Sequence, residues 1–405
     1  MFTRSRASTV RSAASAALAA ALAIGLTACG DAAPKKSTAQ TAADGCITSF
    51  DPNTDYFPVK STLKDAQNFT IEYDNSYQVL TVKQPYPGGK PESYVLVKCG
   101  APKPKLTGAL ASAPQVTVPI HSVFSGSTTH LPLLTDLGRL DDLTGVANAS
   151  YVSGTEARAR IAQAKVAEYA PDGTVNSEKV LAAKPDVLLT AGVDDPAYAS
   201  LRQAGIPVLA DAEWLEGSPL GRAEWLKCMA ALTGDEAKAA TLFDKISQDY
   251  NQVAAKAKGA TPVKVLPGDL YQGTWSMPAG GSYVGRLLAD AGATYPWAND
   301  TSTGNSQVNF EQVAAQDSDA PIWLVTENWH SQADALKADP RYANLAAVKN
   351  NNVWSANKAM GPGGGNDFYE SGVTRPDLVL ADLVAIVHPD LLPGHQFTYY
   401  QQLTH

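Results

Sequence analysis

Hydroxyl side chains gather in one short segment whose residue types suit the binding of an anionic oxygen. The candidate ligand contacts Ser127, Thr128, Thr129 and His130 stand directly before a helix predicted over 131–137. Because backbone amides at a helix N-terminus attract negative charge, this segment favours an oxygen-rich ligand. The alternative is that one hydroxyl only caps the helix, and the two roles are compatible.

Arg222 is the second candidate, in the segment that follows a strand predicted over 206–210 and that includes Trp214. Its guanidinium can form a forked pair with a carboxylate, hydroxamate or catecholate oxygen of a ligand. Glu213 or Glu216 can equally neutralise it within the chain.

A third group consists of aromatic and sulfur-containing side chains in predicted loops. Exposed aromatic rings are costly in water, so either a planar or chelating ligand or packing between lobes is expected to cover them. The candidates that follow predicted strands or the glycine run 361–365 are Tyr271, Trp275, Met277, Trp329, Phe368, Tyr369 and Arg375. The glycine run lacks the Lys and Ser or Thr of a phosphate-binding loop and is interpreted as the flexible edge of a cleft.

The sequence gives little support to a resident metal ion or to catalysis. Its six histidines contain no His-x-x-x-His pair, and the one Glu-x-x-His spacing, Glu327 with His330, stands alone after a strand. A site built from His130 and His330 with Glu213, Glu327 or Asp367 is the alternative, but a metal is expected to arrive already chelated. No Gly-x-Ser-x-Gly elbow is present, so neither a catalytic residue nor a cofactor is predicted.

The composition is that of a globular exported chain. The 405 residues are 44% hydrophobic and 18% charged, enough for two domains or more. Residues 1–28 carry three Arg and no acid, followed by an apolar run over 13–24, which predicts an export signal. Its removal changes the formal net charge from -8 to -11, and so acidic a chain is a poor partner for nucleic acid or anionic membranes.

The residues Leu26-Thr27-Ala28-Cys29 end the apolar run and resemble the lipobox of bacterial lipoproteins. The resemblance implies that residues 1–28 are removed and that Cys29 is diacylated, which anchors an exported protein to the outer face of the cytoplasmic membrane. The alternative is a plain signal cleaved near residues 21–23. Residues 29–45 are expected to form a flexible tether.

The elements that position the candidates follow from the spacing of apolar residues. Short alternating runs over 46–116 predict a β-rich extension, an antiparallel meander packed on the first lobe, whose flanking Cys46 and Cys99 are expected to pair in an oxidising exterior. Residues 117–232 and 260–405 each show short buried strands alternating with helices, which is the pattern of a parallel α/β lobe.

Between the lobes, residues 233–259 predict one long helix. Thr233 and Glu236 fit a capping box, apolar residues then recur every three or four positions, and Gly259 provides a stop. The fold class is therefore α/β, with two lobes joined by a backbone helix, although an ordinary core helix fits the same spacing. The apolar run 225–229 before it is expected in the core.

Together, lipobox, tether, lobes and long helix resemble the helical-backbone class of substrate-binding lipoproteins of ABC importers, which includes receptors for iron(III)-siderophores, haem and cobalamin. The motifs that carry the resemblance are residues 127–131, 183–189, 205–208, 339–342 and 346–349, and for a narrower subfamily residues 212–216, 219–225, 273–278, 365–373 and 375–378. The resemblance implies capture of an iron(III)-siderophore between the lobes and its delivery to a permease and ATPase. Haem, cobalamin or a bare metal ion are alternative ligands, and a hydrolase or a passive surface protein are the competing classes.

The resemblance also implies docking on the permease through one carboxylate per lobe. Asp194 and Asp195, after the strand predicted to end at Thr190, and Asp334, after the strand predicted to end at Thr326, lie in loosely corresponding places. Solvated surface charge is the alternative interpretation for each of them.

Overall fold

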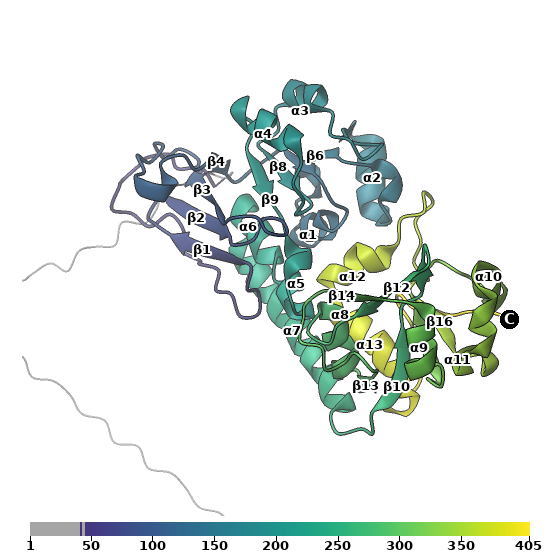
Figure 1. Cartoon of the computed structure of the whole chain (residues 1–405). Helices are drawn as coiled ribbons and strands as arrows, with labels where there is room; N and C mark the ends of the chain where they lie inside the picture. Colours follow the sequence, from purple (N-terminus) through teal and green to yellow (C-terminus); the bar gives the residue numbers. More distant parts are fainter. Residues whose placement is uncertain (1–40, 43–44) are drawn as a thin grey trace, which may run out of the picture. The chain divides into compact units, whose positions relative to one another are not determined.

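Residues 41–42 and 45–405 are described by a computed structural model of the chain, shown in Figure 1. The predicted export signal, Cys29 and most of the predicted tether lie outside the described residues. Among the described residues, no helix combines the length and the apolar character that crossing a membrane requires.

The N-terminal extension forms a four-stranded sheet in the order β1-β2-β3-β4. Its strands are β1 (Phe69–Tyr73), β2 (Tyr77–Val82), β3 (Glu92–Lys98) and β4 (Gln115–Val118). The first three form the predicted antiparallel meander, but β4 runs parallel to β3, because residues 99–114 carry the chain back along the sheet before it pairs again. The predicted disulfide between Cys46 and Cys99 is confirmed, with the two Cα atoms 4.8 Å apart.

The first lobe is built on a five-stranded parallel sheet in the order β7-β6-β5-β8-β9. Its strands are β5 (Val123–Ser125), β6 (Leu143–Val146), β7 (Ala167–Glu168), β8 (Val187–Thr190) and β9 (Val208–Ala210), and its helices are α1 (His130–Leu137), α2 (Thr155–Gln163), α3 (Ser177–Ala183) and α4 (Pro196–Gln203). The predicted parallel α/β pattern is confirmed. The apolar run 117–123 is divided between β4 and β5, because Pro119 lacks the amide that a continuous ladder needs.

One long helix, α7 (Glu236–Ala257), contributes to the cores of both lobes. Ala239 packs into the core of the first lobe, whereas Phe243, Ile246 and Tyr250 pack into the core of the second. At about 1.5 Å per residue its 22 residues extend over about 33 Å. The prediction of one helix that joins two lobes is therefore confirmed.

The start of α7 differs from the predicted capping box. Thr233 is the last residue of the preceding helix α6 (Leu226–Thr233), and its hydroxyl donates to the carbonyl oxygen of Met229. Gly234 then adopts a φ of +77°, which ends α6. Glu236 therefore begins α7 without a partner in a capping box, because the buried apolar run before it stays helical as far as Thr233.

The second lobe holds a five-stranded sheet in the order β13-β10-β15-β16-β17, which is parallel except for β17. Its strands are β10 (Val263–Pro267), β13 (Ala293–Thr294), β15 (Ile322–Val325), β16 (Val353–Ser355) and β17 (Gln401–Gln402), and a small antiparallel sheet beside them contains β11 (Leu270–Tyr271), β12 (Thr274–Pro278) and β14 (Asn305–Val308). Its helices are α8 (Tyr283–Asp290), α9 (Phe310–Asp317), α10 (Gln332–Ala338), α11 (Ala346–Lys349), α12 (Ser371–Thr374) and α13 (Pro376–Val387). The short helix α5 (Pro219–Ala223), which precedes α6 in the chain, also packs into this core.

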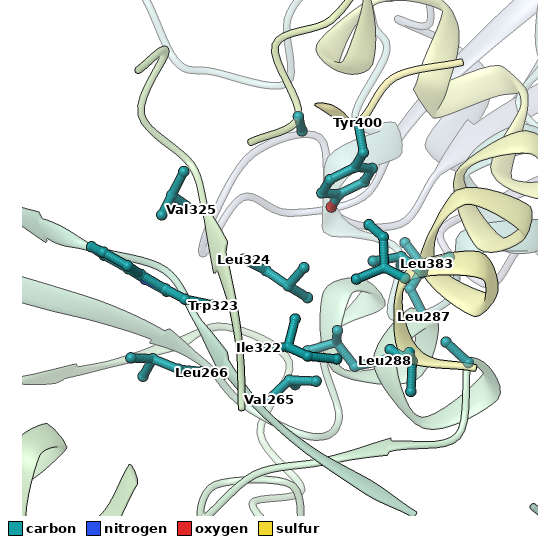
Figure 2. Packing of buried hydrophobic residues seen from close by; sticks show 14 of the residues in the cluster. Val265, Leu266, Leu287, Leu288, Ile322, Trp323, Leu324, Val325, Leu383 and Tyr400 are labelled. Atoms are coloured by element: carbon teal, nitrogen blue, oxygen red, sulfur yellow. The ribbon is translucent and has the colours of Figure 1, made fainter. Parts of the chain in front are cut away.

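The core of the second lobe lies between its parallel sheet and the helices α8 and α13 (Figure 2). Ile322 and Leu324 of β15 face Leu287 of α8 and Leu383 of α13, whereas Trp323 between them points to the opposite side. This alternation is the period of two that a strand imposes on its side chains. Because all four strand residues of β15 are buried, the sheet is covered on both faces.

Two buried carboxylates attach the extension to the helices that follow β9. The Glu224 carboxylate accepts hydrogen bonds from the backbone amides of residues 64–66, at 2.7 to 2.9 Å, and from the Lys227 ammonium at 2.6 Å. The Glu216 carboxylate accepts from the amides of residues 67 and 68, both at 2.9 Å. We call this arrangement the carboxylate clasp. It gives a structural role to acids in the motif stretch 212–225.

Candidate ligand-binding site

The first-lobe part of the site lies at the carboxyl ends of β5 and β6, the edge at which open α/β sheets bind ligands. A cavity of about 280 Å³ is lined there by the predicted Ser127 and Thr128 and by Tyr151, which the sequence analysis did not single out. The Ser127 hydroxyl accepts from the amide and hydroxyl of Thr129, at 3.3 and 2.9 Å, whereas Thr129 at the start of α1 makes no side-chain cap. These hydroxyls order the turn, and Ser127 and Thr128 remain candidates for ligand contact.

His130 is buried beneath this turn and does not line the cavity. Its Nδ1 lies 3.0 Å from the Ser125 hydroxyl, and its Nε2 lies 3.8 Å from the Asp211 carboxylate. Burial lowers the pKa of His130 to about 3, so the imidazole is neutral at physiological pH. His130 was predicted as a ligand contact, but as the first residue of α1 it is buried in the core of the first lobe.

The metal site considered as an alternative does not form in this conformation. His130 is enclosed in the first lobe, whereas His330 is exposed in the second. Over residues 41–42 and 45–405, no group of three or more His, Cys, Asp and Glu side chains is placed to hold a metal ion.

Both predicted arginines are paired within the chain. The Nε and Nη2 atoms of Arg222 lie 2.7 and 2.6 Å from one oxygen of Glu213, and its guanidinium stacks on the ring of Tyr283, 4.2 Å from the centroid. Of the two roles foreseen for Arg222, internal neutralisation by Glu213 is therefore the one that the structure forms. Arg375 pairs with both carboxylate oxygens of Asp377, at 2.9 and 2.6 Å.

A larger cavity, of about 470 Å³, lies in the second lobe at the carboxyl ends of β10 and β15. We call it the aromatic cavity, because its rings are Tyr271, Tyr283, Phe368, Tyr369 and Tyr400. A smaller adjoining pocket shares three of these rings and extends to Pro219 and Arg222 of α5. The structure thus brings together the predicted Tyr271, Phe368 and Tyr369.

Tyr283 and Tyr400 also line the aromatic cavity, although no feature of the sequence distinguishes them from ordinary core residues. The Tyr400 hydroxyl points toward Leu324 and Leu383, which line the same cavity (Figure 2). It has no hydrogen-bond partner among the described residues, and burial raises its pKa, so the phenol stays protonated. A hydroxyl without a partner at the wall of a cavity favours a ligand or a water that completes its hydrogen bonding.

Two carboxylates enter the aromatic cavity directly after parallel strands. Asp269 accepts from the amide and hydroxyl of Thr326, at 2.6 and 2.8 Å, and from the amide of Glu327 at 3.1 Å. The Glu327 carboxylate itself has no hydrogen-bond or ionic partner in the described part of the chain, and burial and the nearby Asp269 raise its pKa. Position after a strand, the signal used for Glu327 in the sequence, could also have found Asp269.

Trp275 and Met277 correct the sequence prediction. Both were expected in an exposed loop, but they lie in β12 with 0% exposure, while Thr274 and Ser276 face outward. The Trp275 indole donates to the carbonyl oxygen of Pro267 at 2.9 Å. The Gly and Pro residues around this segment suggested a loop, whereas the alternation of polar and apolar residues was the better signal, that of a strand.

The other predicted aromatics differ in exposure. Tyr271 is 65%, Tyr369 44% and Trp214 40% exposed, which agrees with surfaces that a ligand can cover. Trp214 donates its indole N–H to the carbonyl oxygen of Ala191, at 3.1 Å. Trp329 is half-buried, with its ring edge against Trp323 at a centroid distance of 5.8 Å.

A second connection joins the lobes beside α7. The buried Glu370 carboxylate accepts from the amide and hydroxyl of Ser153 in the first lobe, both at 2.7 Å, and from the amide of Gly154 at 3.0 Å. We call these contacts the interlobe latch. The glycine run 361–365, predicted as a flexible edge, packs closely here, since a Cβ atom on Gly365 would lie 1.9 Å from the carbonyl oxygen of Tyr151.

Glu370→Gln is expected to weaken the interlobe latch and to lower the free energy of unfolding by about 2 kcal/mol. The glutamine side chain keeps one oxygen that can accept a hydrogen bond, but its NH2 group is itself a donor and cannot accept from the three donor groups of the latch. Hydrogen exchange should become faster at the amides of Ser153 and Gly154. Glu72→Gln, on an exposed position of β1, is the control. Unchanged exchange at both amides would show that the contact is dispensable.

Two of the three acids predicted to dock on a permease have a local structural role. Asp195 accepts from the amide of Ala197 at the start of α4, and Asp334 forms a capping box with Ser331 at the start of α10. Asp194 is exposed. A carboxylate that caps a helix can still present an oxygen to a partner protein. Docking on a permease through these three acids therefore stays a prediction.

The amino-acid sequence is similar to those of known proteins. A family model described as periplasmic binding protein matches residues 123–359. An uncharacterized lipoprotein of Methanocaldococcus jannaschii is 29% identical over 245 residues, 59% of this chain and 57% of that protein, so the chain spans less than two thirds of this relative's length.

Several solved structures have a fold similar to that of this chain. A periplasmic haem-binding protein from Pseudomonas aeruginosa is 20% identical, with a TM-score of 0.53 over 71% of this chain and 99% of that one. A possible iron-binding periplasmic solute-binding protein from Staphylococcus epidermidis is 18% identical, with a TM-score of 0.51 over 67% and 99%. At such identities the likeness concerns the fold.

Proposed function

Because the chain belongs to the periplasmic binding protein family, we propose that it captures an iron(III)-siderophore complex in the aromatic cavity and delivers it to an ABC importer. Proteins of this class bind a small ligand for a permease and are not enzymes. The observation that carries the proposal is the aromatic cavity, whose volume of about 470 Å³ lies within the usual range for small-molecule sites.

The walls of this cavity suit a chelate that is apolar at its rim and polar at its centre. Tyr271 and Tyr369 offer exposed ring faces, and Glu327 and the hydroxyl of Tyr400 offer polar atoms without partners among the described residues. Two proteins of similar fold, a haem-binding protein and a possible iron-binding protein, support an iron complex as the ligand. Haem is the second candidate, since a flat macrocycle would stack on the same exposed rings.

Attachment to the membrane is part of the proposal. Cys29 would carry the lipid anchor, and the lipobox together with a relative described as a lipoprotein supports this. The permease and its ATPase would then be met at the outer face of the cytoplasmic membrane, with Asp194, Asp195 and Asp334 as candidate docking acids.

A calorimetric titration of the detergent-solubilised full chain tests the function. A panel of ferric hydroxamates, ferric catecholates, ferric citrate, haem and cobalamin should contain at least one ligand with micromolar or tighter affinity. Tyr271→Ala should weaken that ligand about tenfold without changing the Tm, because the ring is exposed and contributes little to the core.

Phe50→Ala is the matched control, because Phe50 is an exposed ring of the extension away from the aromatic cavity. The Phe50→Ala chain should bind the same ligand with the affinity of the parent chain. Absence of binding across the whole panel would refute the receptor proposal.

A further inference from the structure

Charged groups are unevenly distributed over the cavities at the sheet edges. Four cavities lie there: the aromatic cavity, the small pocket beside it, the first-lobe cavity at Ser127 and a neighbouring one of about 510 Å³. Their only basic lining residue within the described chain is Arg222. Their acidic lining residues are Asp172, Asp195, Asp269 and Glu327.

The basic residue is not available to an anion. Arg222 is buried and is held by Glu213 through two contacts of 2.6 and 2.7 Å, with Tyr283 stacked on its face. Drawing it toward a ligand would leave the buried Glu213 carboxylate unpaired, which is costly in a low-dielectric interior.

Glu327 has the opposite property. It is partly buried in the wall of the aromatic cavity, and no cation among the described residues neutralises it. Tyr271 and Tyr369 are two exposed rings that line the same cavity, and the face of an aromatic ring attracts cations and repels anions. A trianionic ligand would therefore meet repulsion and find no free donor cation, whereas a ligand with positive charge would gain a partner.

Resting on the proposed function, we propose that the site selects iron(III) chelates of neutral or positive net charge, the class of the ferric trihydroxamates, and rejects trianionic ferric tricatecholates. Glu327 is the residue that sets this preference. Electrostatic discrimination of this kind acts through the sign of the ligand's charge rather than through shape, so ligands of similar size and different charge distinguish it.

Three ferric chelates of similar size test the proposal by calorimetry on the detergent-solubilised full chain. They are a trihydroxamate that carries a free ammonium group (net charge +1), a neutral trihydroxamate and a tricatecholate (net charge -3). Both hydroxamates should bind, and the cationic one should bind more tightly than the neutral one. The tricatecholate should bind at least about 100-fold more weakly than either hydroxamate.

Glu327→Gln should weaken the cationic chelate about fivefold relative to the neutral one. Asp390→Asn is the matched control, because it makes the same change in net charge at an exposed residue outside the four cavities. Its charge preference should equal that of the parent.

The outcomes separate the two proposals. Tightest binding of the tricatecholate would overturn the charge preference and leave the receptor function standing. If Glu327→Gln and Asp390→Asn both lose the preference for the cationic chelate, the preference comes from the net charge of the protein, and the role of Glu327 is overturned. Binding of none of the three chelates, nor of any other member of the panel, would overturn both proposals.

Discussion

Glu224→Ala is expected to lower the free energy of unfolding by about 3 to 5 kcal/mol, because it empties the centre of the carboxylate clasp. Glu224 has 0% exposure, and its removal leaves the amides of residues 64–66 without their acceptor. The buried Lys227 ammonium loses its anionic partner and keeps a hydrogen bond to the carbonyl oxygen of Thr62. Urea unfolding followed by circular dichroism would measure the loss. Limited proteolysis should at the same time cut the segment around residues 64–68, which the clasp holds.

Asp249→Ala provides the comparison for Glu224→Ala. Asp249 pairs with Lys245 on the exposed side of α7, and such surface pairs contribute about 0.5 kcal/mol or less. Equal losses in the two variants would contradict the assignment of a structural role to the clasp, and so would a Glu224→Ala chain that resists protease as well as the parent.

Trp275→Ala is expected to cost about 3 to 5 kcal/mol of stability, since it removes a fully buried indole. The ring packs against residues of β10 and β15: it stacks on Trp323 at a centroid distance of 6.2 Å, and its N–H donates to the carbonyl oxygen of Pro267. Differential scanning calorimetry would show the loss as a lower Tm.

Ser276→Ala is the matched variant for stability, because Ser276 is the next residue of β12 and its side chain is exposed at the wall of the aromatic cavity, outside the core. It should change stability by less than about 0.5 kcal/mol. A Trp275→Ala chain with normal Tm and weakened ligand affinity would restore the earlier interpretation of Trp275 as an exposed binding residue.

The fold was largely predictable because its signals are local. Alternating runs gave β1 to β3, short buried strands followed by helices gave both lobes, and the three-and-four spacing gave α7. The pairing of Cys46 with Cys99 followed from the strands between them. What the spacing did not contain was the direction of β4 and the exact start of α7, since both depend on where neighbouring segments pack.

The site was less predictable, because exposure is decided by partners distant in the sequence. Tyr271 and Trp275 stand four residues apart in similar surroundings, yet one is exposed and the other is core. For Arg222 the sequence left open a ligand contact or pairing within the chain, and only the fold places Glu213 against its guanidinium. Tyr400 reaches the aromatic cavity from the end of the chain, a position that no local pattern connects to β10 and β15.

The interlobe latch has a mechanical consequence when it is combined with α7. The helix joins the lobes at one place, and the hydrogen bonds of Glu370 with Ser153 and Gly154 join them through other elements. Two rigid bodies held at two separate points can turn only about the line through those points. While the latch is intact, the lobes can therefore move relative to each other only by rotation about that axis, and under the proposed function this rotation would open and close the site.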